Sequence, residues 1–123
     1  MTNGSPLQGD IYWVDFDESD GTDDSEQDDP RPAVVLQNNA RNRSNIDTVI
    51  VCKLTRNLNR DADPGNVLLE VGDAGLGESC VVNVSQVFTV RKQDLRDKIG
   101  TLDFIRVWQI YEGLRLLLGP RDD

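Results

Sequence analysis

The chain has 123 residues, 37% of them hydrophobic, and a formal net charge of −9. This length suits one compact domain (residues 1–123) with a single core. No apolar run is long enough to cross a bilayer and residues 1–10 lack a signal-peptide pattern, so we expect a soluble, cytoplasmic protein without membrane contact.

The first half of the sequence predicts three strands. Residues 9–16 are rich in aromatic and β-branched types, and residues 32–38 and 48–54 are apolar runs. The run at 48–54 is almost continuously apolar, so we place it in the centre of the sheet. Residues 17–29 have no apolar face to bury, which predicts a long, mobile acidic loop.

The second half predicts further short strands at 66–71, 79–84 and 86–90, of which the last two can also be one strand bent at Ser85. Polar or glycine-rich connections separate the strands at 39–47, 56–65 and 72–77. Residues 92–98 have room for one short helical turn. Five to seven such short strands favour a small, strongly bent barrel.

The last element has helical spacing. Asp103 is a suitable N-cap and Gly119-Pro120 a suitable stop. The apolar residues at this spacing are Val107, Ile110, Tyr111, Leu114, Leu117 and Leu118. Together with Trp108 they give the helix more apolar surface than one core-facing stripe needs. Either part of this surface pairs with a second copy of the chain across a two-fold axis, or all of it packs on the barrel.

Composition limits the chemistry. The sequence has no histidine, and Cys52 and Cys80 lie in apolar runs. Two buried thiols are therefore favoured over a disulfide or a zinc site, and we expect no metal and no cofactor. Acid–base chemistry must use carboxylates, lysine, tyrosine, arginine or a thiol.

The negative charge is concentrated at the N-terminus. The first thirty residues contain ten acidic and no basic residues, whereas 13 basic and 12 acidic residues follow from Arg31 onward. The larger part of the domain can therefore still present a cationic surface to a nucleic acid.

Three polar positions are candidates for a site. Arg31 lies between two prolines at a loop-to-strand junction, where it is an active group or an exposed charge that balances the acidic loop. Thr55 ends the most buried strand, where it belongs to a site or only starts a turn. Gln86 lies between two pairs of apolar residues, where its side-chain amide either binds a ligand or has no role.

The order of these motifs resembles the MazF/PemK toxins of type II toxin–antitoxin systems, a family that includes the Kid toxin. The resemblance runs from Gly9 to about Leu118. It rests on GDIYWVD at 9–15, SEQ at 25–27 followed by Arg31-Pro32, VVLQN at 34–38, the strand ending at Thr55, SCVV at 79–82 followed by Gln86-Val87, and KIGTL at 98–102.

The resemblance implies a mainly β fold, a small SH3-like β-barrel of the CcdB/PemK type with a C-terminal helix. It also implies a metal-independent endoribonuclease that cleaves single-stranded mRNA as a homodimer and is inhibited by a MazE-like antitoxin. The RNA 2′-hydroxyl would attack the neighbouring phosphorus, leaving 2′,3′-cyclic phosphate and 5′-hydroxyl ends.

Residue by residue, the resemblance assigns catalytic positions to Arg31, Thr55 and Glu26. RNA-binding positions, from the resemblance or from side-chain chemistry, are Ser25, Gln27, Asn38, Asn42, Arg56 and Gln86. Two alternatives stay open: a non-catalytic, CcdB-like toxin that binds gyrase, and a decayed homologue retained for antitoxin binding.

Overall fold

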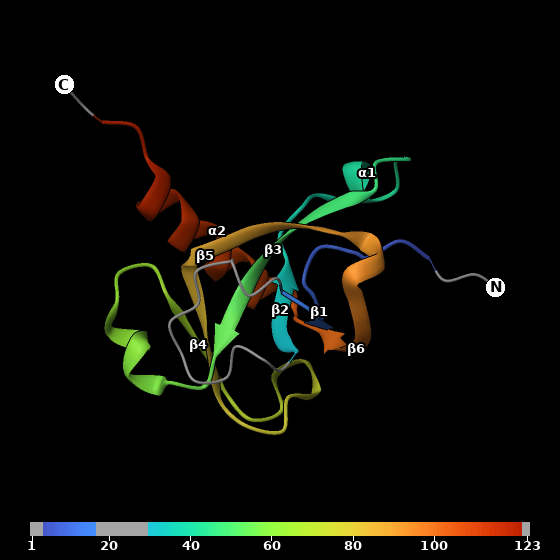
Figure 1. Ribbon diagram of the computed structural model, residues 1–123. Helices are drawn as coiled ribbons and strands as arrows, with labels where there is room; N and C mark the ends of the chain where they lie inside the picture. Colours follow the sequence, from blue (N-terminus) through green and yellow to red (C-terminus); the bar gives the residue numbers. More distant parts are fainter. Residues whose placement is uncertain (1–3, 17–29, 122–123) are drawn as a thin grey trace.

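A computed structural model describes residues 4–16 and 30–121 of the chain (Figure 1). The expected acidic loop at 17–29 lies outside the described residues. Six strands form one antiparallel sheet in the order β4-β5-β3-β2-β1-β6. Their bounds are β1 (Asp10–Val14), β2 (Arg31–Val35), β3 (Thr48–Thr55), β4 (Val67–Leu69), β5 (Cys80–Arg91) and β6 (Leu95–Thr101).

The sheet curls into a half-barrel, and the C-terminal helix α2 (Phe104–Leu118) packs against β4 and β5 (Figure 1). This confirms the predicted mainly β fold with a C-terminal helix and the central position of β3. The strand bent near Ser85 is one continuous strand, β5. Asp103 caps α2 as predicted, because its carboxylate accepts a hydrogen bond from the Arg106 backbone amide.

The sequence prediction missed one strand. Only Lys92–Asp94 form the expected helical turn (η4), and the residues after it form β6. Most side chains of β6 are charged or exposed, since β6 is an edge strand paired only with β1 among the described strands. The other connections contain the short helices α1 (Asn39–Asn42), η2 (Leu58–Ala62) and η3 (Asp73–Gly75).

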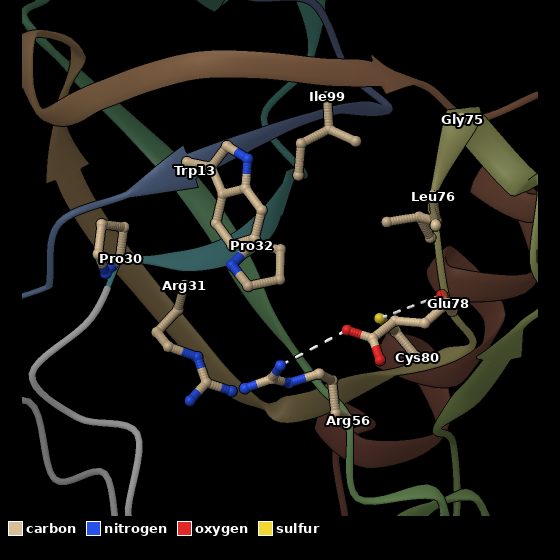
Figure 2. Close-up of a pocket in the computed structure, with 11 residues that line it drawn as sticks. Trp13, Pro30, Arg31, Pro32, Arg56, Gly75, Leu76, Glu78, Cys80 and Ile99 are labelled. Atoms are coloured by element: carbon tan, nitrogen blue, oxygen red, sulfur yellow. Dashed lines mark hydrogen bonds and ion pairs between the residues drawn. The ribbon is translucent and has the colours of Figure 1, made fainter.

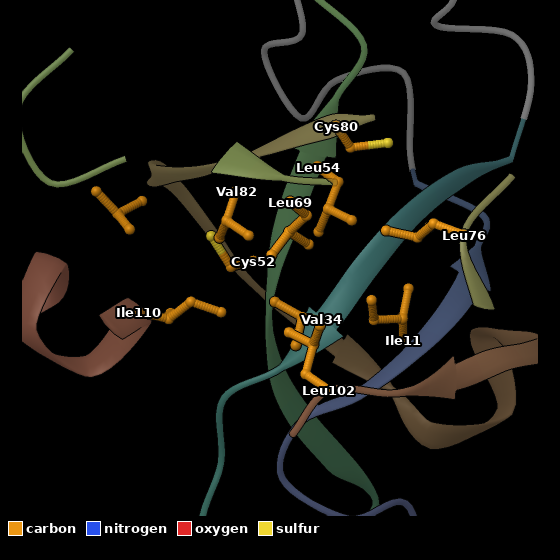
Figure 3. Close-up of a cluster of buried hydrophobic side chains, with 11 residues drawn as sticks. Ile11, Val34, Cys52, Leu54, Leu69, Leu76, Cys80, Val82, Leu102 and Ile110 are labelled. Carbon is orange, nitrogen blue, oxygen red and sulfur yellow. The ribbon is translucent and has the colours of Figure 1, made fainter. Parts of the chain in front are cut away.

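Alternate residues of the strands build two cores, one on each face of the sheet. The larger includes Ile11, Val34, Cys52, Leu54 and Val82 and is closed by Ile110 of α2 (Figure 3). The smaller consists of Val14, Ala33, Val35, Val49 and Val51. The position of a residue in β2 or β3 therefore decides which face its side chain occupies.

Helix α2 buries less of its surface than its sequence predicts. Only Ile110 and Gly113 are buried, whereas Tyr111 and Leu118 of the predicted stripe are exposed. The helix crosses the chain closely at Gly113, where an added Cβ would clash with the Gly65 carbonyl oxygen. Among the described residues, no helix has the length and apolar character to cross a membrane.

Both cysteines are buried thiols rather than halves of a disulfide, as predicted. Cys52 belongs to the larger core, and its thiol donates a hydrogen bond to the Asn83 carbonyl oxygen at 3.0 Å. Burial raises the pKa of the Cys52 thiol to about 12, because the apolar surroundings disfavour the thiolate. The thiol is therefore protonated at neutral pH and does not act as a nucleophile.

We expect Cys52 in the folded protein to resist thiol reagents at pH 8, where its thiolate fraction is about one in ten thousand. The unfolded thiol ionises near its ordinary pKa of about 8.5. Its reaction rate should therefore rise by several orders of magnitude in guanidinium chloride. Peptide mass spectrometry after timed labelling measures both rates. Rapid labelling of Cys52 in the native protein would contradict its burial.

Candidate active site

Arg31 and Thr55 lie together because of the register between β2 and β3. The last pair of this antiparallel ladder is Ala33 with Lys53. The same register, extended by two residues on each strand, sets Arg31 opposite Thr55 on the same face. Both side chains line one cleft of about 180 Å³. The guanidinium and the hydroxyl that the sequence singled out therefore share a single concave site.

Thr55 also starts a turn. Its hydroxyl oxygen accepts a hydrogen bond from the Asn57 backbone amide at 3.1 Å, and Asn57 caps the helix η2 that follows. A hydroxyl that accepts one hydrogen bond can still donate its own hydrogen. The turn thus fixes the oxygen at the strand end while the hydroxyl keeps its capacity to donate into the cleft.

Gln86 enters the cleft through an irregularity in β5. Cys52 pairs with Val87 and Leu54 pairs with Val82, so Lys53 alone on β3 faces residues 83–86 on β5. These extra residues form a large bulge, a feature that bends a strand and redirects its side chains. Asn83, Ser85 and Gln86 line the cleft as a result.

Side chains from two other segments, and one contact within the bulge, stabilise it. The Val84 amide donates to the Asn66 side chain at 2.9 Å, and the Asn83 carbonyl accepts from Cys52. The Asn83 side chain in turn accepts a hydrogen bond from the Ser85 hydroxyl at 2.9 Å. Backbone groups that the bulge removes from the ladder thus find new partners, as buried polar groups require.

Lys53 is a cleft residue that the sequence interpretation missed. Its side chain is only 7% exposed, and its ammonium lies 4.3 Å and 4.6 Å from the ring centroids of Phe16 and Phe88. Cation–π contacts of this kind contribute about 2 kcal/mol when they are shielded from water. A lysine inside the apolar run at 48–54 was the signal that could have identified it.

A second, larger hollow of about 650 Å³ lies beside the cleft, and Arg31 lines both (Figure 2). Its wall includes Trp13, Pro32 and Arg56, and the Arg56 guanidinium forms an ion pair with Glu78 at 3.5 Å. Figure 2 shows Arg31 and Arg56 extending to the same side of this hollow. Arg31 and Arg56 therefore both line this hollow.

Two of the predicted RNA-binding residues lie at the opposite end of β2. Asn38 caps α1, because its side chain accepts a hydrogen bond from the Arg41 amide. Asn42 is fully buried, and its amide exchanges hydrogen bonds with the Gln37 side chain and backbone. Asn42 thus stabilises a chain corner, and we leave it out of the proposed RNA contacts.

Ser25, Glu26 and Gln27 lie outside the described residues. Of the predicted site, the structure brings together Arg31, Thr55 and Gln86 and places Arg56 beside them.

Comparison with known proteins shows where this arrangement belongs. Endoribonuclease MazF6 from Mycobacterium tuberculosis is 33% identical over 111 residues, covering 90% of this chain and 95% of the relative. Endoribonuclease EndoA from Bacillus subtilis is 32% identical over 115 residues, covering 94% and 96%.

A solved mycobacterial endoribonuclease in complex with its cognate antitoxin superposes with a TM-score of 0.74 at 27% identity, covering 97% of this chain and all of the other. The sequence model of one family, the PemK-like, MazF-like toxins of type II toxin–antitoxin systems, matches residues 7–118 of this chain. Because the family model, the sequence relatives and the solved fold agree, the chain belongs to the PemK-like, MazF-like toxin family.

Proposed function

We propose that this protein is an endoribonuclease that cuts single-stranded RNA in the cleft between Arg31 and Thr55. The observation that carries the proposal is that these two groups face one cleft from opposite positions on neighbouring strands. The relatives from Mycobacterium tuberculosis and Bacillus subtilis, both named endoribonucleases, support the same activity.

The proposed reaction uses a nucleophile that the RNA supplies. The 2′-oxygen forms a bond to the adjacent phosphorus and the bond from phosphorus to the 5′-oxygen breaks, which leaves a 2′,3′-cyclic phosphate. The 2′-hydroxyl loses a proton, and the departing 5′-oxygen gains one. The protein must therefore move two protons and stabilise negative charge on the phosphate.

Arg31 and Thr55 are suited to the charge on the phosphate. A guanidinium presents parallel N–H donors that match two phosphate oxygens, and the threonine hydroxyl adds a donor from the facing strand. Donors fixed before the reaction stabilise the transition state without reorganising. We assign the base to Glu26, and we propose that Arg31 is the acid that gives a proton to the departing 5′-oxygen.

Gln86 and Arg56 are the proposed contacts beside the scissile phosphate. The Gln86 amide can donate to and accept from the edge of an unpaired base, and Arg56 can meet a neighbouring phosphate. We also propose that an antitoxin blocks this surface, since the mycobacterial structural neighbour was solved with its cognate antitoxin.

Arg31→Ala and Thr55→Val should each lower the rate of RNA cleavage by at least about 10²-fold, because each removes a donor to the transition state. The assay mixes purified protein with a long single-stranded RNA in EDTA and maps the ends by sequencing. An RNA with 2′-deoxyribose at the cut position should still bind but remain whole.

Arg91→Ala is the matched control, because Arg91 is exposed at the far end of β5 and away from the cleft. Cleavage of the deoxy substrate at the normal rate, or full activity of Arg31→Ala, would overturn the mechanism. No cleavage by the unaltered protein would favour a decayed homologue.

We further propose a homodimer that uses the exposed face of α2. Phe104, Trp108 and Tyr111 form a stacked row with ring centroids 6.4 Å and 5.5 Å apart, and each is more than half exposed. The row borders an apolar hollow of about 400 Å³ between the helix and β2. Self-complementary pairing of such a patch is the usual way to cover it.

Light scattering during size-exclusion chromatography should give twice the chain mass of 13.7 kDa. Trp108→Lys should shift the protein to the monomer mass, because it places a charge in the centre of the apolar row. Val71→Lys is the control, since Val71 is also an exposed apolar residue but lies in a turn after β4. A monomeric unaltered protein, or a dimer that survives Trp108→Lys, would contradict this interface.

A further inference from the structure

Trp13 is an exposed tryptophan in a strand whose neighbouring residues are buried or half-buried. The next residue, Val14, is fully buried, whereas Trp13 is 41% exposed. Trp13 lines the larger hollow beside the cleft, and it also lines a more open hollow of about 530 Å³ together with Asp15 and Arg96. The indole therefore stands between two hollows instead of inside a core, where most of a tryptophan surface is usually covered.

Strand pairing brings Trp13 beside the proposed reaction centre. Trp13 pairs with Pro32 on β2, and Val14 pairs with Arg31. Adjacent residues of a strand point to opposite faces, but Arg31 begins β2 and lines both the larger hollow and the cleft. A nucleotide whose phosphate lies in the cleft can therefore turn around the end of β2 and place its base in the larger hollow.

The larger hollow suits a base rather than a phosphate. Its volume is about 650 Å³, against about 180 Å³ for the cleft, so it has room for a flat ring system. Apolar side chains from three segments lie around the Trp13 ring on its wall, namely Pro30 and Pro32, Leu76, and Ile99 (Figure 2). An aromatic face among apolar neighbours is the surface on which an unpaired base stacks.

The glycine-rich turn on this wall, residues 72–77, is fixed from two sides. Asp73 forms an ion pair with Arg106 of α2 at 3.0 Å. Ala74 has a left-handed backbone, with φ of 53°, and an added Cβ on Gly100 of β6 would clash with its carbonyl oxygen. Such strain persists only where the surrounding structure holds it, and it is common at ligand sites. The wall is therefore shaped before a ligand binds, which lowers the cost of binding.

We infer that the larger hollow is a nucleobase subsite, in which the Trp13 ring stacks on an unpaired base next to the cut. The inference rests on the proposed endoribonuclease function and adds a base-binding residue to it. Stacking uses the face of the ring, so it does not depend on the charges of the arginines nearby. Because every base has a flat face only when it is unpaired and splayed out, the contact favours single strands over duplexes.

The test removes each partner of the proposed stack, alone and together. The intact probe is a single-stranded RNA containing the mapped cut site with 2′-deoxyribose at that position, so that it binds without being cleaved. In two further probes, one or the other of the nucleotides that border the cut lacks its base. Trp13→Leu removes the aromatic ring and keeps an apolar side chain. We expect Trp13→Leu to weaken binding of the intact probe roughly tenfold, and one of the two abasic probes to bind the unaltered protein more weakly by a similar factor.

The two losses should not add, because both changes remove the same contact. Trp13→Leu should bind the intact probe and that abasic probe equally well. Trp13→Phe, which keeps an aromatic face, should retain most of the affinity. The slope of log Kd against log salt concentration should stay the same in Trp13→Leu, since stacking neutralises no phosphate.

Leu116→Ala is the matched control, because Leu116 is an exposed apolar residue of α2 that lines neither the cleft nor the larger hollow. This variant should bind the intact probe as the unaltered protein does and should keep the loss with the abasic probe. Thermal melting of each variant checks the fold. Trp13→Gln serves as a second variant without an aromatic ring, and unfolding of both ringless variants would assign Trp13 to the fold and overturn its role in binding.

The outcomes separate this inference from the proposed function. If the unaltered protein neither binds nor cuts RNA, the proposed function fails. If it cuts RNA in an Arg31-dependent way but folded Trp13→Leu binds the intact probe as tightly as the unaltered protein, only the role of Trp13 is overturned. Losses from Trp13→Leu that add fully to those of both abasic probes would also exclude the stack.

Discussion

The register between β2 and β3 is the constraint on which the candidate site depends. Pairing of Ala33 with Lys53 sets Arg31 opposite Thr55 and directs Arg31, Lys53 and Thr55 to one face. A slip by one residue would turn one strand's side chains to the other face. It would also remove Val49 and Val51 from the smaller core, so that core stabilises the register that the chemistry needs.

The bulge in β5 completes the site. If β5 paired regularly with β3, the ladder of hydrogen bonds would continue past Lys53. Instead, residues 83–86 leave the ladder, and Gln86 lies in the cleft as a result. Asn66 and Cys52 satisfy backbone groups within the bulge. Cys52 therefore contributes to the site through a protonated thiol, which its burial and raised pKa maintain.

The sequence predicted the elements whose periodicity is strong, namely the central strand β3 and the capped helix α2, and it left open whether β5 is one strand or two. It missed β6, because an edge strand with many charges lacks the alternation that marks a strand. Family resemblance, rather than local pattern, connected Arg31 to Thr55, since register is a long-range property. Burial of Asn42 and the place of Lys53 were missed because both depend on tertiary neighbours.

The central claim is that the Arg31 guanidinium and the Thr55 hydroxyl act on the same phosphate. A crystal structure with an RNA whose scissile nucleotide lacks its 2′-hydroxyl tests it most directly. We expect both groups to lie within about 3 Å of oxygens on the phosphate that follows this nucleotide. An RNA bound across another face, or the two groups on different phosphates, would contradict it.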